Sequence, residues 1–118
     1  MPELTKAQVA RRDAERKMQE TILTALIAAG YAIGVDNGAD EEEERSTDVA
    51  ALHGLLGQTD RDILYCYKGG DRGDCPSGWV SLIYGNLPSE LVADYTTNLE
   101  AALVPVDELS TKLDERGL

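Results

Sequence analysis

Two short apolar runs are the strongest feature in the pattern of hydrophobic and polar positions along the chain. They cover residues 62–68 and 78–84 and flank a glycine-rich segment, residues 69–77. Both runs are too short for helices, are rich in aromatic and β-branched residues, and are bounded by turn-forming residues. This pattern predicts two antiparallel strands joined as a hairpin.

Alternation along each strand predicts which side chains share a face of this hairpin. Tyr65, Tyr67 and Trp79 fall on one face, and both faces are largely apolar. Two apolar faces indicate either that both are covered or that one is a binding surface. The three aromatic residues are therefore candidate partner-binding residues, with packing in the core as the alternative.

A third strand is predicted where apolar and polar residues alternate over residues 31–36. The turn pair Asn37-Gly38 stops it, and no apolar run follows that could pair with it as a local hairpin. We therefore expect a three-stranded mixed or antiparallel sheet. In this arrangement residues 31–36 lie antiparallel beside residues 78–84, and a helix crosses over between the first two strands.

A long N-terminal helix is predicted by a capping box of Thr5 and Gln8, followed by helix-favouring residues until Gly30. Its apolar stripe is weak before Met18 and strong after it. We expect the second half of the helix to dock on the core, and residues 1–17 to project from it or to pack loosely.

Helical signals predict three further helices, near residues 47–57, 89–103 and 106–116. Ser46 or Thr47 is expected to cap the first, with Asp48 in its first turn. Ser89 is expected to cap the second, and Pro105 separates it from the third. Together these elements predict one α+β domain over residues 1–118, with the helices mainly on one face of the sheet.

The net charge of the chain bears on its function rather than on its fold. The chain holds 11 basic and 22 acidic residues, a formal net charge of −11. So negative a surface repels phosphate backbones and anionic membranes, which argues against direct binding of nucleic acid or of a membrane and favours cationic partners. The acidic side chains around the predicted first crossover are the strongest candidates for partner binding. They are Asp36, Asp40, Glu41, Glu42, Glu43, Glu44 and Asp48.

Two interpretations of this acidic segment remain open. Blocks of like charge are commonly solvated, which would make residues 36–47 a solvated loop. Closely spaced carboxylates can also mimic nucleic acid by occupying a groove of lysine and arginine side chains. A calcium loop is excluded, because a loop starting at Asp36 has Gly38 at its third position and Thr47 at its twelfth, where carboxylates are needed.

Candidates for catalytic or metal chemistry are weak. His53 could join Cys66 and Cys75 in a metal site, but the two cysteines lack the spacing of a metal motif. Neither cysteine begins an evident helix that would activate a thiolate, and Cys66 fits a small core residue. We expect no cofactor, no metal and no enzymatic activity.

The compartment is predicted from two absences in the sequence. No N-terminal leader pattern is present, and no run approaches the length of a membrane span. We expect a soluble protein of a reducing cytoplasm, with both thiols free.

The sequences WVSLIYGN, residues 79–86, and DYTTNLE, residues 94–100, resemble a pattern found in small uncharacterised acidic proteins of bacteriophages and other mobile elements. The resemblance covers about the C-terminal half of the chain. Those proteins carry Asp-Gly-Trp after the Gly-Asn pair, where this chain has residues 87–89, Leu-Pro-Ser. Because the family has no established activity, the resemblance implies a bacterial or phage setting.

We carry two hypotheses for function from the sequence. The first is a non-enzymatic inhibitor from a phage or mobile element, which binds a basic host protein or nucleoprotein complex through a surface that mimics nucleic acid and so blocks host defence. The second is a structural or accessory module that acts as a homodimer, another homo-oligomer or an assembly factor. Binding that weakens with salt favours the first, and self-association favours the second.

Overall fold

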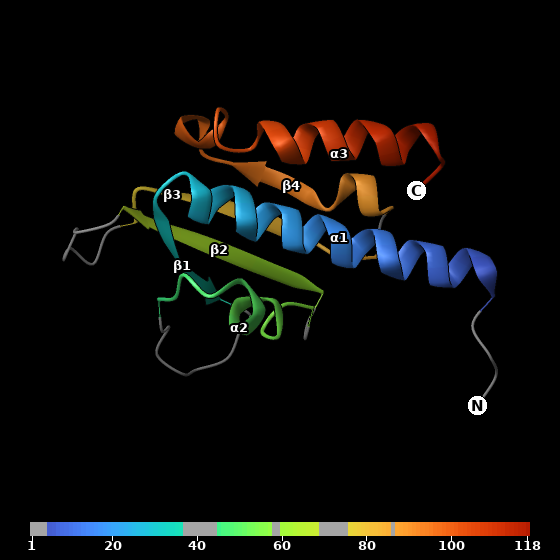
Figure 1. The fold of residues 1–118 in the computed structure, drawn as a ribbon, viewed down its shortest axis with the longest axis horizontal. Coiled ribbons are helices and arrows are strands. Elements are labelled where there is room, and N and C mark those ends of the chain that lie inside the picture. The colour runs from blue at the N-terminus through green and yellow to red at the C-terminus, as the bar shows by residue number, and fades with distance from the viewer. Residues whose placement is uncertain (1–4, 37–44, 58–59, 69–75, 86) are drawn as a thin grey trace.

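The computed structural model describes residues 5–36, 45–57, 60–68, 76–85 and 87–118. In it a long helix, α1 (Lys6–Ala28), crosses one face of an antiparallel sheet (Figure 1). The short helix α2 (Val49–His53) and the C-terminal helix α3 (Val104–Glu115) lie on either side of α1 (Figure 1). The α+β class and the long N-terminal helix are confirmed.

The sheet has four strands rather than the three predicted, in the order β1-β2-β3-β4, and all neighbouring pairs are antiparallel. The strands are β1 (Tyr31–Asp36), β2 (Arg61–Lys68), β3 (Gly78–Ile83) and β4 (Val92–Tyr95). The predicted hairpin of the two apolar runs is confirmed as β2 and β3, which pair in the register Tyr65 to Trp79.

The predicted position of the first strand was wrong. Strand β1 pairs with β2, in the register Ile33 to Cys66, rather than with β3. The other edge of β3 is taken by β4, so that no edge remains there for β1. Pairing of β1 with β2 or with β3 would keep the same alternation of buried and exposed side chains, so the sequence pattern could not distinguish these two neighbours.

The predicted helix over residues 89–103 was also wrong. This segment forms a 3-10 turn, η1 (Pro88–Glu90), then strand β4, then a second 3-10 turn, η2 (Thr97–Leu99). The helical signals in this segment are short. Strand β4 extends the sheet from β3 and so uses backbone N–H and C=O groups that a helix would have paired internally.

Both ends of α1 follow the local signals. Gln8 N donates to Thr5 Oγ1 over 3.1 Å, and Thr5 N donates to Gln8 Oε1 over 2.8 Å, which is the predicted capping box. At the other end Gly30 has a φ of 98°, a conformation that side chains rarely allow. In the first turns of α1 most side chains are exposed, and Ala14 is the first buried residue.

A helix forms within the predicted range 47–57, but α2 covers only Val49–His53, and its cap differs from the prediction. Asp48, rather than Ser46 or Thr47, is the N-cap, and its Oδ1 accepts from Ala50 N over 3.1 Å. The Oγ of Ser46 accepts from Asp48 N over 3.0 Å, while the backbone of Ser46 forms an isolated antiparallel bridge with Ile33 on the outer edge of β1. The backbone groups of these two residues exchange two hydrogen bonds of 2.9 Å.

The predicted C-terminal helix is confirmed as α3. It begins at Val104, two positions before the predicted start at residue 106, so that Pro105 lies in its first turn rather than ahead of it. Proline is tolerated there, since the first turn of a helix has no internal acceptor for the missing N–H group.

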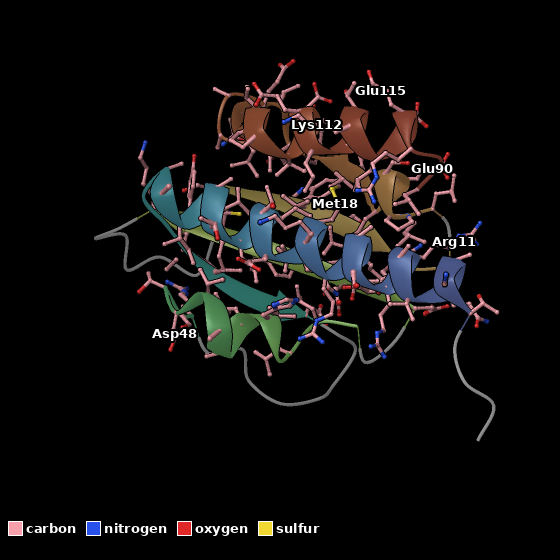
Figure 2. All side chains as sticks on the ribbon, turned by 45° about the vertical axis from the view of Figure 1, so that its right-hand side comes forward. Arg11, Met18, Asp48, Glu90, Lys112 and Glu115 are labelled. Carbon is pink, nitrogen blue, oxygen red and sulfur yellow. The ribbon has the colours of Figure 1, made fainter. Side chains whose placement is uncertain are left out.

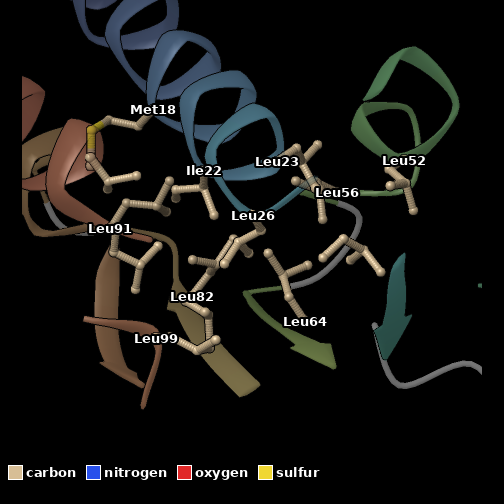
Figure 3. Packing of buried hydrophobic residues seen from close by; sticks show 14 of the residues in the cluster. Met18, Ile22, Leu23, Leu26, Leu52, Leu56, Leu64, Leu82, Leu91 and Leu99 are labelled. Atoms are coloured by element: carbon tan, nitrogen blue, oxygen red, sulfur yellow. The ribbon is translucent and has the colours of Figure 1, made fainter. Parts of the chain in front are cut away.

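The core lies between α1 and the sheet and continues beneath α3 (Figure 3). Leucine dominates it, and both β2 and β3 alternate between buried and partly exposed positions. The buried apolar residues are Ala14, Met18, Ile22, Leu23, Leu26, Ile33, Leu52, Leu56, Leu64, Cys66, Val80, Leu82, Leu91, Leu99, Leu103, Val106, Leu113 and Leu118.

Candidate interaction surface

The second face of the sheet forms the candidate site, and we call it the open sheet face. Its side chains alternate with the buried ones of β2 and β3 and are only partly buried; they are Ile63, Tyr65, Trp79, Ser81 and Ile83. They line a shallow pocket of about 420 Å³, which Arg61, Ala93 and Asp94 complete. The sheet is thus covered by helices on one face and, among the described residues, presents an apolar surface on the other.

Two aromatic side chains stand together at one end of the open sheet face, the end nearest the connection from β2 to β3. Tyr65 and Trp79 are direct cross-strand partners in the register of β2 and β3. The backbone of Trp79 is held on its other side by Thr96, because Trp79 N donates to Thr96 Oγ1 and Thr96 N donates to Trp79 O, each over 3.1 Å. A large aromatic anchor on a rigid strand loses little conformational entropy when a partner covers it.

Tyr67 lies two residues after Tyr65 in β2 and was predicted to share its face, but its side chain is buried. The guanidinium carbon of Arg45 lies 3.6 Å from the centroid of the Tyr67 ring, and Tyr67 is only 7% exposed. The bridge of Ser46 to Ile33 brings Arg45 to this place. The structure therefore leaves Tyr65 and Trp79 side by side and partly exposed on the open sheet face, whereas the guanidinium of Arg45 covers Tyr67.

The acidic candidates are only partly placed by the structure. Asp36 is exposed at the end of β1, and Asp48 caps α2 (Figure 2). The carboxylate of Asp48 therefore has a structural task in addition to any contact with a partner. Asp40, Glu41, Glu42, Glu43 and Glu44 lie outside the described residues.

A buried polar chain that the sequence did not predict connects β2 to α2. Asp62 has no exposed surface, and its Oδ2 accepts from Tyr84 Oη over 2.5 Å and from Gly57 N over 2.9 Å. Gln19 Nε2 donates to Tyr84 Oη over 3.2 Å, and Gln19 Oε1 lies 2.9 Å from His53 Nε2. The available signal was the alternation of β2, which places Asp62 on the same face as the buried residues Leu64 and Cys66.

Two titratable groups in the interior, the phenol of Tyr84 and the thiol of Cys66, are held in their neutral forms. Burial, reinforced by the hydrogen bond to Asp62, raises the pKa of the Tyr84 phenol. Burial also raises the pKa of the Cys66 thiol to about 12. Cys66 is a free, fully buried thiol, as expected for a small core residue, while Cys75 lies outside the described residues. A thiol in this state is a poor nucleophile.

The described residues offer neither a cluster of metal ligands nor a helix of membrane-spanning character. In the part of the chain that the structure describes, no three His, Cys, Asp or Glu side chains are grouped so that they could hold a metal ion. None of the described helices combines the length and the apolar character that crossing a membrane requires.

No protein-family model, curated protein or solved structure matches this chain. The resemblance to small phage proteins therefore stays a prediction, and the site has to be interpreted from its own geometry and charge.

Proposed function

We propose that this protein is a non-enzymatic interaction protein that binds a basic partner through the open sheet face and the acidic residues around it. The observation that carries the proposal is the cross-strand pair of Tyr65 and Trp79 on an apolar surface that no described element covers. Interfaces concentrate much of their binding energy in a few large aromatic residues of this kind.

Charge selects the chemistry of the partner. The chain carries a formal net charge of −11, and Asp36 and Asp94 are exposed near the two edges of the sheet. A field of this sign accelerates encounter with a basic protein and opposes nucleic acids and anionic membranes. The acidic segment 36–48 would add contacts to lysine and arginine side chains at the rim.

The biological setting of the proposal comes from the resemblance of residues 79–86 and 94–100 to small proteins of phages and mobile elements. With a basic partner, it supports an inhibitor that acts in the cytoplasm of a bacterial host. Such an inhibitor would occupy the phosphate-binding groove of a nucleic-acid-handling complex by mimicking its nucleic acid, and would need no cofactor.

A pull-down from bacterial lysate, eluted with a salt gradient, tests the proposal when matched baits are compared. The first pair is Trp79→Ala against Val9→Ala, which shortens an exposed apolar side chain on α1. The second pair neutralises four acids in each bait. One bait changes Glu41, Glu42, Glu43 and Glu44 to Gln, and the control changes Glu20, Glu108 and Glu115 to Gln and Asp114 to Asn.

We expect the wild type and both controls to retain a basic protein that elutes with salt, and we expect Trp79→Ala to lose it. Titration of the purified partner should then show an affinity loss of about tenfold or more for Trp79→Ala, as for a large aromatic side chain that the partner covers. Retention of the same protein by Trp79→Ala with unchanged affinity would overturn the role of the open sheet face. An equal effect of the two charge-neutralised baits would overturn the role of residues 41–44.

Self-association is the second candidate, because the same apolar face could be covered by a second copy of the chain. Two copies of charge −11 repel each other, which makes a basic partner the better fit. Light scattering over a wide range of protein concentration separates the two. A dimer that Trp79→Ala abolishes would favour the accessory module, and a strict monomer would count against its homo-oligomeric form.

A further inference from the structure

A second pocket lies on the helical side of the molecule, between β4, η1 and the start of α3. Its volume is about 420 Å³. Met18 reaches into this region from α1 (Figure 2). The pocket shares no lining residue with the open sheet face, so a ligand bound here is independent of the proposed partner-binding function.

The inner walls of this pocket are apolar and buried. Met18, Leu103 and Val106 line it and are exposed by only 1%, 5% and 4%, respectively. Val92 of β4 completes this apolar part. Walls of this kind accept the methylene groups of a ligand and exclude water from around them.

Apart from the exposed Val104 and the ring of Tyr95, the remaining lining groups are acidic or polar. Glu100 and Asp107 are exposed carboxylates at the pocket, and no ion pair is recorded for either among the described residues. Ser89 also lines the pocket, and its buried Oγ has no hydrogen-bond partner in the described part of the chain. Ser110 lines it too and donates its hydroxyl to Ser89 O over 2.6 Å.

Tyr95 adds an aromatic ring to the same pocket. It is 36% exposed, so that a ligand in the pocket can reach its ring. The face of an aromatic ring attracts cations, and a ring placed beside carboxylates is a recurring way to bind ammonium groups.

We propose that the pocket between β4 and α3 binds an alkylammonium group, with its methylenes against Met18 and Val106 and its charge at Glu100, Asp107 and Tyr95. The lining contains no lysine, arginine or histidine that could receive an anion. The first turn of α3 would attract an anion by its dipole, but Asp107 already occupies that turn. A lysine side chain of another protein and a free amine share this chemistry.

The proposal is tested by titrating the ¹³C-methyl signals of Val92, Leu103 and Val106 with n-pentylamine. Pentanol and pentanoate serve as neutral and anionic probes of the same length. We expect pentylamine to shift these signals with saturation at a dissociation constant on the order of 1 mM, which is typical for so small a ligand. Pentanol should bind more weakly, and pentanoate should not bind.

A double variant, Glu100→Gln with Asp107→Asn, isolates the charge contribution. We expect it to weaken pentylamine binding by about tenfold while pentanol binding stays the same, because only the attraction of the ammonium is removed. Glu108→Gln is the matched control, since Glu108 is the exposed neighbour of Asp107 and does not line the pocket. It should bind pentylamine as the wild type does.

A short peptide with one internal lysine, compared with its norleucine analogue, separates the two sources of the amine. Shifts by pentylamine and by the lysine peptide, but not by the norleucine analogue, would identify a protein side chain as a ligand. Shifts by pentylamine but not by the lysine peptide would identify a free amine. No saturable shift with pentylamine, or equal binding of the three five-carbon probes, would overturn the proposal. The double variant folds if its methyl spectrum keeps the dispersion of the wild type, so a loss of binding is not mistaken for unfolding.

Discussion

Tyr84 donates its phenolic hydrogen to a carboxylate that has no exposed surface, Oδ2 of Asp62, over 2.5 Å. The same oxygen accepts from Gly57 N, while Oδ1 has no hydrogen-bond partner among the described residues. The interior thus holds a carboxylate whose donors come from two segments distant in sequence, just after α2 and just after β3. Such a group is costly to leave without its donors.

Replacing Tyr84 with Phe should therefore destabilise the fold. The variant removes the hydroxyl that donates to Asp62 and keeps the ring, and we expect a loss of roughly 1–3 kcal/mol in the free energy of unfolding. Urea denaturation measures this value. Tyr65→Phe removes a hydroxyl from the open sheet face and should change stability by less than about 0.5 kcal/mol. Equal effects of the two variants would contradict the importance of the bond between Tyr84 and Asp62.

The stability added by the Tyr84 hydroxyl should depend on pH in the alkaline range. Because the pKa of Tyr84 is raised in the folded state, the unfolded chain releases the phenolic proton first, at about pH 10, and the native chain retains it. The contribution is complete below that pH and is lost as pH rises toward the folded pKa. Urea denaturation from about pH 8 to about pH 11 should show the gap between wild type and Tyr84→Phe narrowing. A constant gap would contradict the raised pKa.

Cys66 should be unreactive in the native protein. Its side chain is fully buried and its pKa is raised to about 12, so that both access and the thiolate form are lacking. In a Cys75→Ser background, labelling by iodoacetamide should accelerate in step with unfolding as urea is added. Rapid labelling without denaturant, at the rate of a small-molecule thiol, would show that β2 is not covered by α1 as described.

Gly78→Ala should test the contact that positions Trp79. A Cβ at residue 78 would lie 2.5 Å from Thr96 Oγ1 and 3.0 Å from Leu99 Cγ, so that Thr96, which binds Trp79 N, has to move. We expect a destabilisation of roughly 1–3 kcal/mol in thermal or urea unfolding. Gly54→Ala is the control, because its Cβ would meet nothing closer than 3.5 Å. A neutral Gly78→Ala would mean that the strand end accommodates a methyl group.

Local signals predicted those elements that depend on nearby residues. The capping box of Thr5 and Gln8, the glycine end at Gly30 and the hairpin of β2 and β3 all form as expected. Each is decided within a few residues, by side-chain hydrogen bonds, by the left-handed backbone or by alternation of side chains.

The candidate site was predictable to the same extent. Alternation placed Tyr65 and Trp79 on one face, and the register of the hairpin made them neighbours. The cover over Tyr67 was not predictable, because Arg45 reaches it only through the bridge of Ser46 to Ile33.

By itself, then, the sequence determined the acidic charge, the long first helix and a two-sided apolar hairpin. Tertiary structure decided which strand became an edge and which face stayed open: β4 extended the sheet where a helix was predicted, and β1 was left to pair with β2. The physical reason is that pairing between strands uses backbone groups that every residue carries. The choice of neighbour therefore depends on which edge is free and on which face α1 buries.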